Sequence, residues 1–518
     1  MGMKDAEDIT RHTGDDGDEP EFRVVSVVRR HGRERPEAPA LTGDGRTVSY
    51  GELDARSSRA ARLLLAEGVR AGDRVAYVGK NAPEYFDLLF GAAKLGAVTV
   101  PVNWRLTAEE IEAILADAGA VLTLADREAG PFQAPGRLLR TGPEFEDGLA
   151  AHEASDPGFT GTPDDIVAQL YTSGTTGVPK GVPLSNRNFS VGERRASSWL
   201  LDEHSVNLVA SPVFHVGGTG WALTGLHAGC HHIVVRDVRA AELAELFERH
   251  RITNGFVVPA VLQAMCDLPE RHDYSAVRAI GYGAAPITTG LLRRVKEVIG
   301  APLYQVYGMT ETTGTMVQLD PADHEREDLL RSAGRPFPWV ELKIADPETG
   351  RELPPGETGE VWVRSDQNTR GYWNRPEETA RLLTPDGWLR TGDAGHVGAE
   401  GHLFLTDRIK DMIVTGGENV YPVEVEEVLA RHPGIADVAV VGVPDPRWGE
   451  SVLAVVVPVG PGGPTEEDVL EYGRRHLAGF KRPRAVVFLD ELPRNPGGKV
   501  LKRDLRAPYW EAEGRSIG

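Results

Sequence analysis

The sequence predicts an α/β protein, with a large N-terminal domain of layered α/β subdomains, a small β subdomain and a small C-terminal α+β domain. Short apolar strands alternate with helices of about ten to fifteen residues from Phe22 onward, which favours helices packed on a largely parallel sheet. The region 335–405 is rich in glycine, proline and short β segments, and βα alternation resumes after Asp411. The chain of 518 residues is also too long for one simple core.

Two residue pairs have the spacing of a capping box, in which a hydroxyl and a carboxylate each accept the other's backbone N–H. Ser49 with Glu52 predicts a helix that ends at Gly68, and Thr107 with Glu110 predicts another. The remaining helices predicted in the large domain cover residues 83–94, 240–251 and 259–268. Its predicted strands cover 74–79, 97–102, 120–124, 166–170, 207–211, 232–236, 255–258 and 277–281.

The domain boundary is predicted at 406–411, so that the N-terminal core covers 22–407 and the C-terminal domain covers 412–518. In the β subdomain, strands are predicted at 341–344, 359–364 and 403–405. In the C-terminal domain, helices are predicted at 424–432 and 465–477, and strands at 436–442, 451–458 and 485–488. Residues 1–21 are polar and bunch acidic side chains together, which predicts a disordered tail.

Composition excludes several classes of protein. The net charge of −20 argues against a nucleic acid or an anionic membrane as a main partner. There is no run of about eighteen apolar residues that would predict a membrane span. Cys230 and Cys266 are the only two cysteines, too few for a disulfide framework or a cysteine zinc site. Without an apolar signal segment, a cytoplasmic location is expected.

The stretch 171–181, YTSGTTGVPKG, combines glycines, hydroxyl side chains and one cation. Glycines allow a tight turn whose N–H groups bind phosphate oxygens. Ser173, Thr175 and Thr176 add hydroxyl donors, and Lys180 adds a compact charge. The spacing differs from the nucleotide P-loop, in which the lysine directly follows a glycine. The stretch therefore predicts a phosphate-binding loop after the strand 166–170, the alternative being a solvated turn between two strands.

Three later motifs place single charged residues beside glycines or hydroxyls. In 307–312, YGMTET, Glu311 suits a magnesium ion held between a carboxylate and substrate phosphates. In 387–393, GWLRTGD, Asp393 stands on a predicted tight turn, where a carboxylate can accept hydrogen bonds from two ribose hydroxyls. In 493–500, PRNPGGKV, Lys499 stands on a glycine-rich loop.

In this order the motifs resemble those of the adenylate-forming superfamily, which includes acyl-CoA synthetases, luciferase-like enzymes and the adenylation domains of peptide synthetases. Within this superfamily, the motifs most resemble those of bacterial fatty-acid–CoA ligases. The resemblance spans residues 171–499. It implies ATP, Mg²⁺ and, as a co-substrate, coenzyme A.

The resemblance also implies a role for each motif. Glu311 and Thr175 would bind Mg²⁺, Thr310 would touch the α-phosphate, and Lys499 would bridge the α-phosphate and the substrate carboxylate. Tyr307 would stack near adenine, and residues 283–286 would form the other face of the adenine slot. The implied catalytic residues are Lys180, His215, Thr310, Glu311 and Lys499. The implied ATP- and AMP-binding residues are Thr172, Ser173, Gly174, Thr175, Thr176, Gly177, Lys180, Gly283, Ala284, Ala285, Pro286, Gln305, Tyr307, Gly308, Met309, Thr310, Asp393, Arg408 and Lys499.

A second group of residues is implied in transfer to the thiol. The loop 416–422, GGENVYP, resembles the C-terminal loop that lines the pantetheine tunnel after a large domain rotation, and Lys410 matches the hinge, 408–411. Hinge closure of this kind completes a second active site. The basic cluster 480–484 could meet CoA phosphates through Lys481, the alternative being a solvated charge run. The implied thiolation residues are Lys410, Gly416, Gly417, Glu418 and Lys481.

The segment 214–221, FHVGGTGW, matches the start of the acyl pocket in the same family. His215 is expected as a wall of the acyl or pantetheine channel, with no part in proton transfer. The glycines leave space, which suits an aliphatic or aryl acid. The implied pocket residues are Phe214, His215, Val216, Gly217, Gly218 and Trp221.

The leading hypothesis is an ATP-dependent carboxylic acid–CoA ligase that forms an acyl-adenylate and then acyl-CoA, with a small-molecule acid as substrate and no nucleic-acid partner. The alternative is an adenylating enzyme of a natural-product pathway that passes the activated group to a carrier protein or an amine, or activates a small anion such as nitrite. The segment 367–370, QNTR, is unusual for the family and is consistent with this alternative. A non-enzymatic nucleotide sensor would have lost Glu311 or Lys499, and both are present. A homodimer is one possible assembly.

Overall fold

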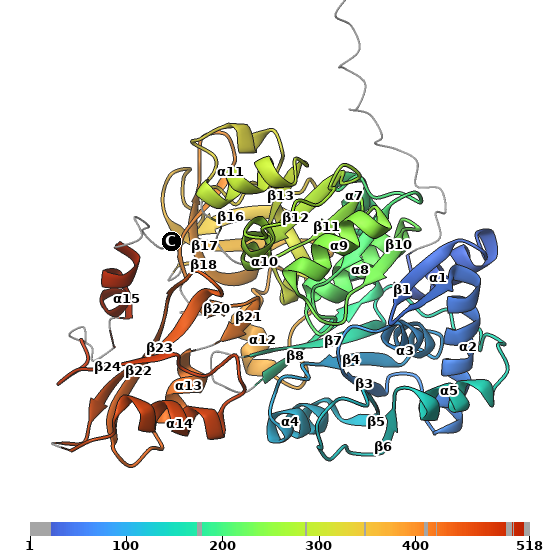
Figure 1. Cartoon of the computed structure of the whole chain (residues 1–518), viewed down its shortest axis with the longest axis horizontal. Helices are drawn as coiled ribbons and strands as arrows, with labels where there is room; N and C mark the ends of the chain where they lie inside the picture. Colours follow the sequence, from blue (N-terminus) through green and yellow to red (C-terminus); the bar gives the residue numbers. More distant parts are fainter. Residues whose placement is uncertain are drawn as a thin grey trace, which may run out of the picture.

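The computed structural model describes residues 22–173, 179–284, 287, 289–346, 349–408, 413–420, 422–460, 462–493, 500 and 502–511. It confirms the α/β class, because helices cover largely parallel sheets in the N-terminal part and a smaller unit of strands and helices follows. Figure 1 shows this smaller unit, in orange and red, beside the larger blue-to-yellow part.

The largest sheet has the strand order β15-β14-β13-β12-β11-β9-β10-β1-β2. The strands from β13 to β1 run parallel, and antiparallel strands close both edges. The strands are β1 (Pro39–Gly43), β2 (Arg46–Ser49), β9 (Val206–Val209), β10 (His231–Val234), β11 (Asn254–Phe256), β12 (Ala279–Gly283), β13 (Leu303–Met309), β14 (Gly314–Leu319) and β15 (Arg335–Pro336).

A second sheet has the order β6-β5-β3-β4-β7-β8 and is parallel except for its last pair. Its strands are β3 (Arg74–Val78), β4 (Val98–Val102), β5 (Ala120–Ala125), β6 (Arg137–Arg140), β7 (Ile166–Ser173) and β8 (Pro179–Ser185). The helix α3 (Pro83–Ala93) is buried along nearly all of its length, so it lies in the interior of the N-terminal part.

The other helices of the N-terminal part follow from their local sequence. Both predicted capping boxes are confirmed, at Ser49 before α2 (Tyr50–Ala66) and at Thr107 before α4 (Ala108–Ala118). The remaining ones are α1 (Val24–Glu34), α5 (Pro143–Ala150), α6 (Asn186–Phe189), α7 (Gly192–Ser198), α8 (Val216–His227), α9 (Ala240–His250), α10 (Pro259–Cys266), α11 (Thr289–Val298), η1 (Thr310–Thr312) and η2 (Asp323–Glu325).

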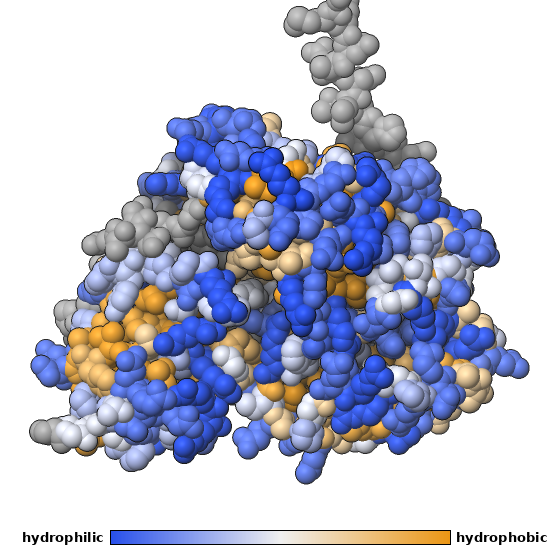
Figure 2. Space-filling model, in the orientation of Figure 1, coloured by the Kyte–Doolittle hydropathy of each residue, from blue (hydrophilic) through white to orange (hydrophobic). Residues whose placement is uncertain are grey.

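Two further sheets follow along the chain. An antiparallel sheet contains β16 (Glu341–Ala345), β17 (Gly359–Arg364), β18 (Leu389–Val397) and β19 (Leu403–Arg408), with α12 (Pro376–Leu382) between two of them. The last sheet contains β20 (Ile413–Thr415), β21 (Glu418–Val420), β22 (Ile435–Asp445), β23 (Gly449–Pro458) and β24 (Ala485–Phe488), with α13 (Pro422–Leu429), α14 (Glu466–His476) and α15 (Lys502–Glu511). Figure 2 shows a hydrophobic patch over this last sheet on a mostly hydrophilic face.

Two predicted loops are strands in the structure. The stretch predicted as a loop from Tyr171 onward remains in β7 as far as Ser173, because β7 pairs antiparallel with β8 up to Ser173 opposite Pro179. Asp393, predicted on a tight turn, lies within β18, where its backbone pairs with Arg408 of β19. In both cases long-range strand pairing extends a strand into sequence, beside or containing glycines, that is typical of turns.

Among the described residues, no helix combines the length and the apolar character that crossing a membrane requires. Both cysteines, Cys230 and Cys266, are buried and free.

Candidate active site

The predicted phosphate stretch forms the flanks of a β-hairpin. Thr172 of β7 lies opposite Lys180 of β8. Lys180 is only 8% exposed, so its cation is held inside the molecule beside the hairpin. Residues 174–178 lie outside the described residues, so the roles predicted for 174–177 stay predictions.

Glu311 lies on η1, in the turn between β13 and β14, and is buried. The Tyr372 hydroxyl donates a hydrogen bond of 2.6 Å to its Oε1. The Nζ of Lys180 lies 5.2 Å from the centroid of the same Tyr372 ring. Tyr372 therefore brings the predicted phosphate-binding cation and the predicted magnesium acid to one place, although about 130 residues separate them in sequence.

Asp393 and Tyr307 also meet. The Tyr307 hydroxyl donates a hydrogen bond of 2.6 Å to Asp393 Oδ2, which joins β13 to β18. Arg408 pairs with Asp393 through its backbone; its side chain, like Lys410 and Lys499, lies outside the described residues. The contact orients the Asp393 carboxylate through Tyr307, which lies four residues before Glu311 in the sequence.

The predicted adenine slot lies at the carboxyl ends of β12 and β13, where ligands bind in α/β folds. A Cβ atom at Gly283 would lie 2.4 Å from Val306 O, so only glycine permits this close approach. Ala284 has φ +63°, a strained left-handed conformation for alanine.

Other residues predicted for ATP lie nearby on these strands. Gln305 accepts a hydrogen bond of 3.2 Å from the Tyr282 hydroxyl. Ala285 and Pro286 lie outside the described residues, and Met309 and Thr310 form the junction of β13 with η1.

The C-terminal loop reaches the N-terminal part. Gly416 and Gly417 form the turn between β20 and β21. Glu418, the first residue of β21, is buried. Its carboxylate lies 3.0 Å from His215 Nε2, accepts a hydrogen bond of 3.2 Å from Asn103 and forms an ion pair with Arg105. Burial alone would raise the pKa of Glu418, but His215 and Arg105 outweigh it and hold this pKa below its usual value.

The predicted acyl segment begins at His215, the N-cap of α8. A Cβ atom at Gly218 would lie 2.1 Å from Pro212 O, and one at Gly217 would lie 3.3 Å from the Phe256 ring. These two glycines therefore permit close packing, and the open space predicted for them is filled by the protein itself. Trp221 packs in the core between Trp199 and Phe256. Phe214 is buried and Val216 is partly buried.

Lys481 is buried, and its Nζ donates hydrogen bonds of 2.7 Å to Glu110 and 2.6 Å to Glu424. Burial would lower the pKa of Lys481, but the two carboxylates outweigh it and raise this pKa. The lysine thus links the C-terminal domain to the capping-box acid of α4, and its predicted role toward CoA phosphates stays a prediction.

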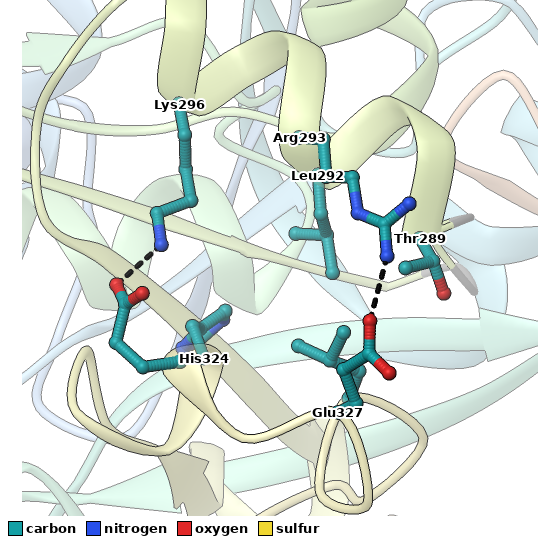
Figure 3. Close-up of a pocket in the computed structure, with 8 residues that line it drawn as sticks. Thr289, Leu292, Arg293, Lys296, His324 and Glu327 are labelled. Atoms are coloured by element: carbon teal, nitrogen blue, oxygen red, sulfur yellow. Dashed lines mark hydrogen bonds and ion pairs between the residues drawn. The ribbon is translucent and has the colours of Figure 1, made fainter.

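A separate hollow lies between α11 and η2 (Figure 3). Arg293 forms an ion pair of 2.9 Å with Glu327, and Lys296 forms an ion pair with Glu325. Both cations of the hollow therefore face carboxylates that line the same hollow. His324, at its inner wall, lies 2.8 Å from the Tyr282 hydroxyl behind the adenine slot. Within the described ranges, no group of three or more His, Cys, Asp or Glu side chains converges as a metal site.

Sequence reasoning missed Tyr372, Arg105 and Asn103 as members of this site. Their neighbours in sequence carry no pattern that sets them apart, because their contacts depend on how separate sheets pack. For Tyr372 a weak signal was available, since its aromatic hydroxyl follows Gly371 directly after the unusual segment 367–370.

Two family models match the chain. One, described as AMP-binding enzyme, matches residues 28–373, and one for the AMP-binding enzyme C-terminal domain matches residues 424–499. The fatty acid–[acyl-carrier-protein] ligase ScoC of Streptomyces coeruleorubidus is 42% identical, over 95% of this chain and 98% of its own length. A feruloyl-CoA synthase of Amycolatopsis sp is 40% identical, over 93% and 98%.

Two solved structures of one enzyme, the o-succinylbenzoate CoA synthetase MenE of Bacillus subtilis, differ in their likeness to this chain. A double mutant bound with a product analogue, OSB-NCoA, gives a TM-score of 0.83 at 30% identity, covering 92% of this chain and 98% of its own. The complex with the acyl-adenylate intermediate OSB-AMP gives 0.69 at 30% identity, covering 92% and 97%. At nearly equal coverage, the overall likeness of this chain is therefore greater to the product-analogue complex.

Proposed function

Because this chain belongs to the AMP-binding enzyme family, we propose that it is an ATP-dependent ligase that joins a carboxylic acid to the thiol of coenzyme A. In the first half-reaction the carboxylate of the acid attacks the α-phosphorus of ATP, and pyrophosphate leaves. In the second, the thiolate attacks the acyl carbon, and AMP leaves. The observation that carries the proposal is the convergence of Lys180 and Glu311 on Tyr372, next to the joined pair Tyr307 and Asp393.

Charge complementarity supports the first half-reaction. Two anions, the acid and the triphosphate, must approach each other, and Lys180 and Lys499 would lower their repulsion in a site that excludes water. Glu311 fits a magnesium ion, since Mg²⁺ is usually held by one or two carboxylates together with substrate phosphates, and Tyr372 orients this carboxylate. Bound there with Thr175, the metal would neutralise part of the phosphate charge.

The position of the C-terminal loop supports the second half-reaction. Glu418 is held by His215, Arg105 and Asn103, and a Cβ atom at Gly417 would lie 3.7 Å from Val258 at the start of α10. The loop therefore lies against the segment predicted for the acyl and pantetheine channel. We infer that this is the arrangement for thiol transfer, and that rotation about the hinge 408–411, which includes Lys410, brings Lys499 to the site for adenylation.

Coenzyme A is the acceptor that the surface beside this loop favours. The Trp448 ring has the guanidinium groups of Arg447 and Arg484 at 4.6 and 4.8 Å from its centroid, and Trp448 O accepts a hydrogen bond from Gly416 N. A flat ring beside two guanidinium groups suits a phosphorylated nucleotide, which CoA carries and a protein-bound pantetheine lacks. A carrier-protein thiol is the second candidate, favoured by the likeness to ScoC.

The testing experiment measures pyrophosphate release with ATP, Mg²⁺ and a panel of acids: short, medium and long aliphatic acids, an aryl acid, malonate and nitrite. Each acid is tested alone, with CoA and with a pantetheine-loaded acyl carrier protein. CoA-dependent turnover with an acyl-CoA mass supports the ligase. Turnover only with the carrier protein selects the second candidate, and no pyrophosphate with any acid contradicts adenylation.

Replacing Lys499 tests the two-arrangement account. Lys499→Ala should lower adenylate formation by about 100-fold or more, because a charge aimed at the reacting phosphate is lost. Thioester formation from acyl-adenylate supplied ready-made should change little. An equal loss in both half-reactions would contradict the account.

A further inference from the structure

The turn that carries Glu311 has a backbone conformation that its sequence disfavours. Thr313 follows η1 with φ +52°, and Gly314 follows with φ +87°. A β-branched residue rarely adopts the left-handed region, and such a conformation persists only where the surroundings determine it. Thr312 and Thr313 are fully buried, so those surroundings are protein and not water.

Two buried side chains bind the carbonyl groups of this turn. Gln367 donates from Nε2 to Thr312 O at 2.7 Å and to Thr315 O at 3.0 Å. Arg195 of α7 donates from Nη1 to Thr313 O at 2.8 Å and from Nη2 to Thr315 O at 2.9 Å. Together they bind the carbonyl groups of Thr312, Thr313 and Thr315.

The segment that contains Gln367 also holds Glu311 itself. Thr369 N donates a hydrogen bond of 2.7 Å to Glu311 O, and Tyr372 binds the Glu311 carboxylate. Trp373 N donates 2.8 Å to Gly181 O, next to Lys180. The segment 367–373 therefore lies between the hairpin of Lys180 and the turn of Glu311, and it contacts both.

We propose that Gln367 and Arg195 are positioning residues for adenylation, which hold the turn 310–315 in its left-handed form and so fix Glu311 relative to Lys180. This inference rests on the proposed function. It gives the unusual segment 367–370 a role in the first half-reaction, through the backbone of the turn, and none in the choice of acceptor.

Gln367→Met tests the proposal, with Gln318→Met as its matched control. Gln318 is also a buried glutamine that accepts a hydrogen bond from an indole, Trp199 Nε1 at 2.6 Å, just as Gln367 accepts one from Trp339 Nε1 at 2.9 Å. It lies on β14 but does not bind the turn. Both variants leave buried polar groups unpaired, so both should lower stability, and only Gln367→Met should act on the turn.

Three readouts separate positioning from stability. In the ligand-free protein, hydrogen–deuterium exchange at the amides of 311–315 should be about tenfold faster in Gln367→Met than in Gln318→Met at equal distance below each variant's melting temperature. The Mg²⁺ concentration that half-saturates ATP binding, followed by calorimetry, should rise about fivefold or more. Adenylation should slow about tenfold, while thioester formation from supplied acyl-adenylate stays within about twofold.

Arg195 is tested by a graded pair. Arg195→Met removes both donors, and Arg195→Lys keeps an amine donor but lacks the planar fork that reaches the carbonyl groups of Thr313 and Thr315 together. Lysine should therefore recover part of the adenylation rate and of the Mg²⁺ response that methionine loses. The proposal is overturned if Gln367→Met matches Gln318→Met in exchange and Mg²⁺ response, or if both half-reactions fall equally. A wild-type protein that releases no pyrophosphate with any acid instead contradicts the proposed function, while the exchange result still tests the turn.

Discussion

At the scale of single residues, burial sets the charge of several histidines. His232 is fully buried on β10, with Nδ1 3.2 Å from Cys230 O and Nε2 3.0 Å from Ala222 O. Burial lowers its pKa to about 4, against the two carbonyl contacts that raise it. The folded protein therefore holds a neutral imidazole at this position under neutral and mildly acidic conditions.

This pKa predicts a dependence of stability on pH. The folded value of about 4 lies below the ordinary 6.5, so the unfolded chain binds the extra proton between these values, and stability falls as pH falls through that window. Between pH 7 and 5, wild type should lose about 2 kcal/mol more of its free energy of unfolding than His232→Gln. Chemical denaturation at both pH values measures this, and equal losses would contradict a neutral buried His232.

At the scale of elements, the β20–β21 hairpin presents the loop that meets the acyl segment. Gly417 has φ +82°, which favours glycine, and its Cα hydrogen faces Val258. The adjacent Glu418 ties the hairpin to residues from two other segments, at Asn103–Arg105 and at His215. In the arrangement proposed for thiol transfer, this short hairpin would border the path of the thiol.

Gly417→Leu should lower thioester formation from supplied acyl-adenylate by about 100-fold, because the side chain would occupy the proposed pantetheine path. Adenylate formation should remain within about threefold of wild type, since it uses the other arrangement. Gly462→Leu is the matched control, with a similar positive φ of +89° on the same domain and open space around it. If thioester formation survives in Gly417→Leu, the tunnel assignment is wrong.

At the scale of the whole molecule, ion pairs connect the two domains. Lys481 lies between Glu424 of its own domain and Glu110 of α4, and Glu418 lies between His215 and Arg105. Removing one member of a buried ion pair leaves an uncompensated charge, which is strongly destabilising. These contacts therefore stabilise the observed arrangement over any arrangement that separates the pairs.

Lys481→Met should leave two carboxylates facing each other across the domain boundary and disfavour this arrangement. Thioester formation should slow about tenfold, with adenylation unchanged. The double variant Lys481→Met, Glu110→Gln should recover most of the loss, because glutamine removes the repulsion and can still complete the capping box. Failure of the second substitution to rescue would show that the lysine acts elsewhere, for example on CoA phosphates.

Periodicity and motifs of a few adjacent residues are enough to predict the α/β class, the two capped helices and the family. The same motifs single out Lys180, Glu311, Asp393 and Glu418. Three sets of contacts depend instead on the folded chain: Lys180 and Glu311 meet at Tyr372, Gln367 and Arg195 bind the turn beside them, and Lys481 pairs with Glu110, 371 residues away. Contacts of this kind depend on how sheets and domains pack, and local sequence does not encode that packing.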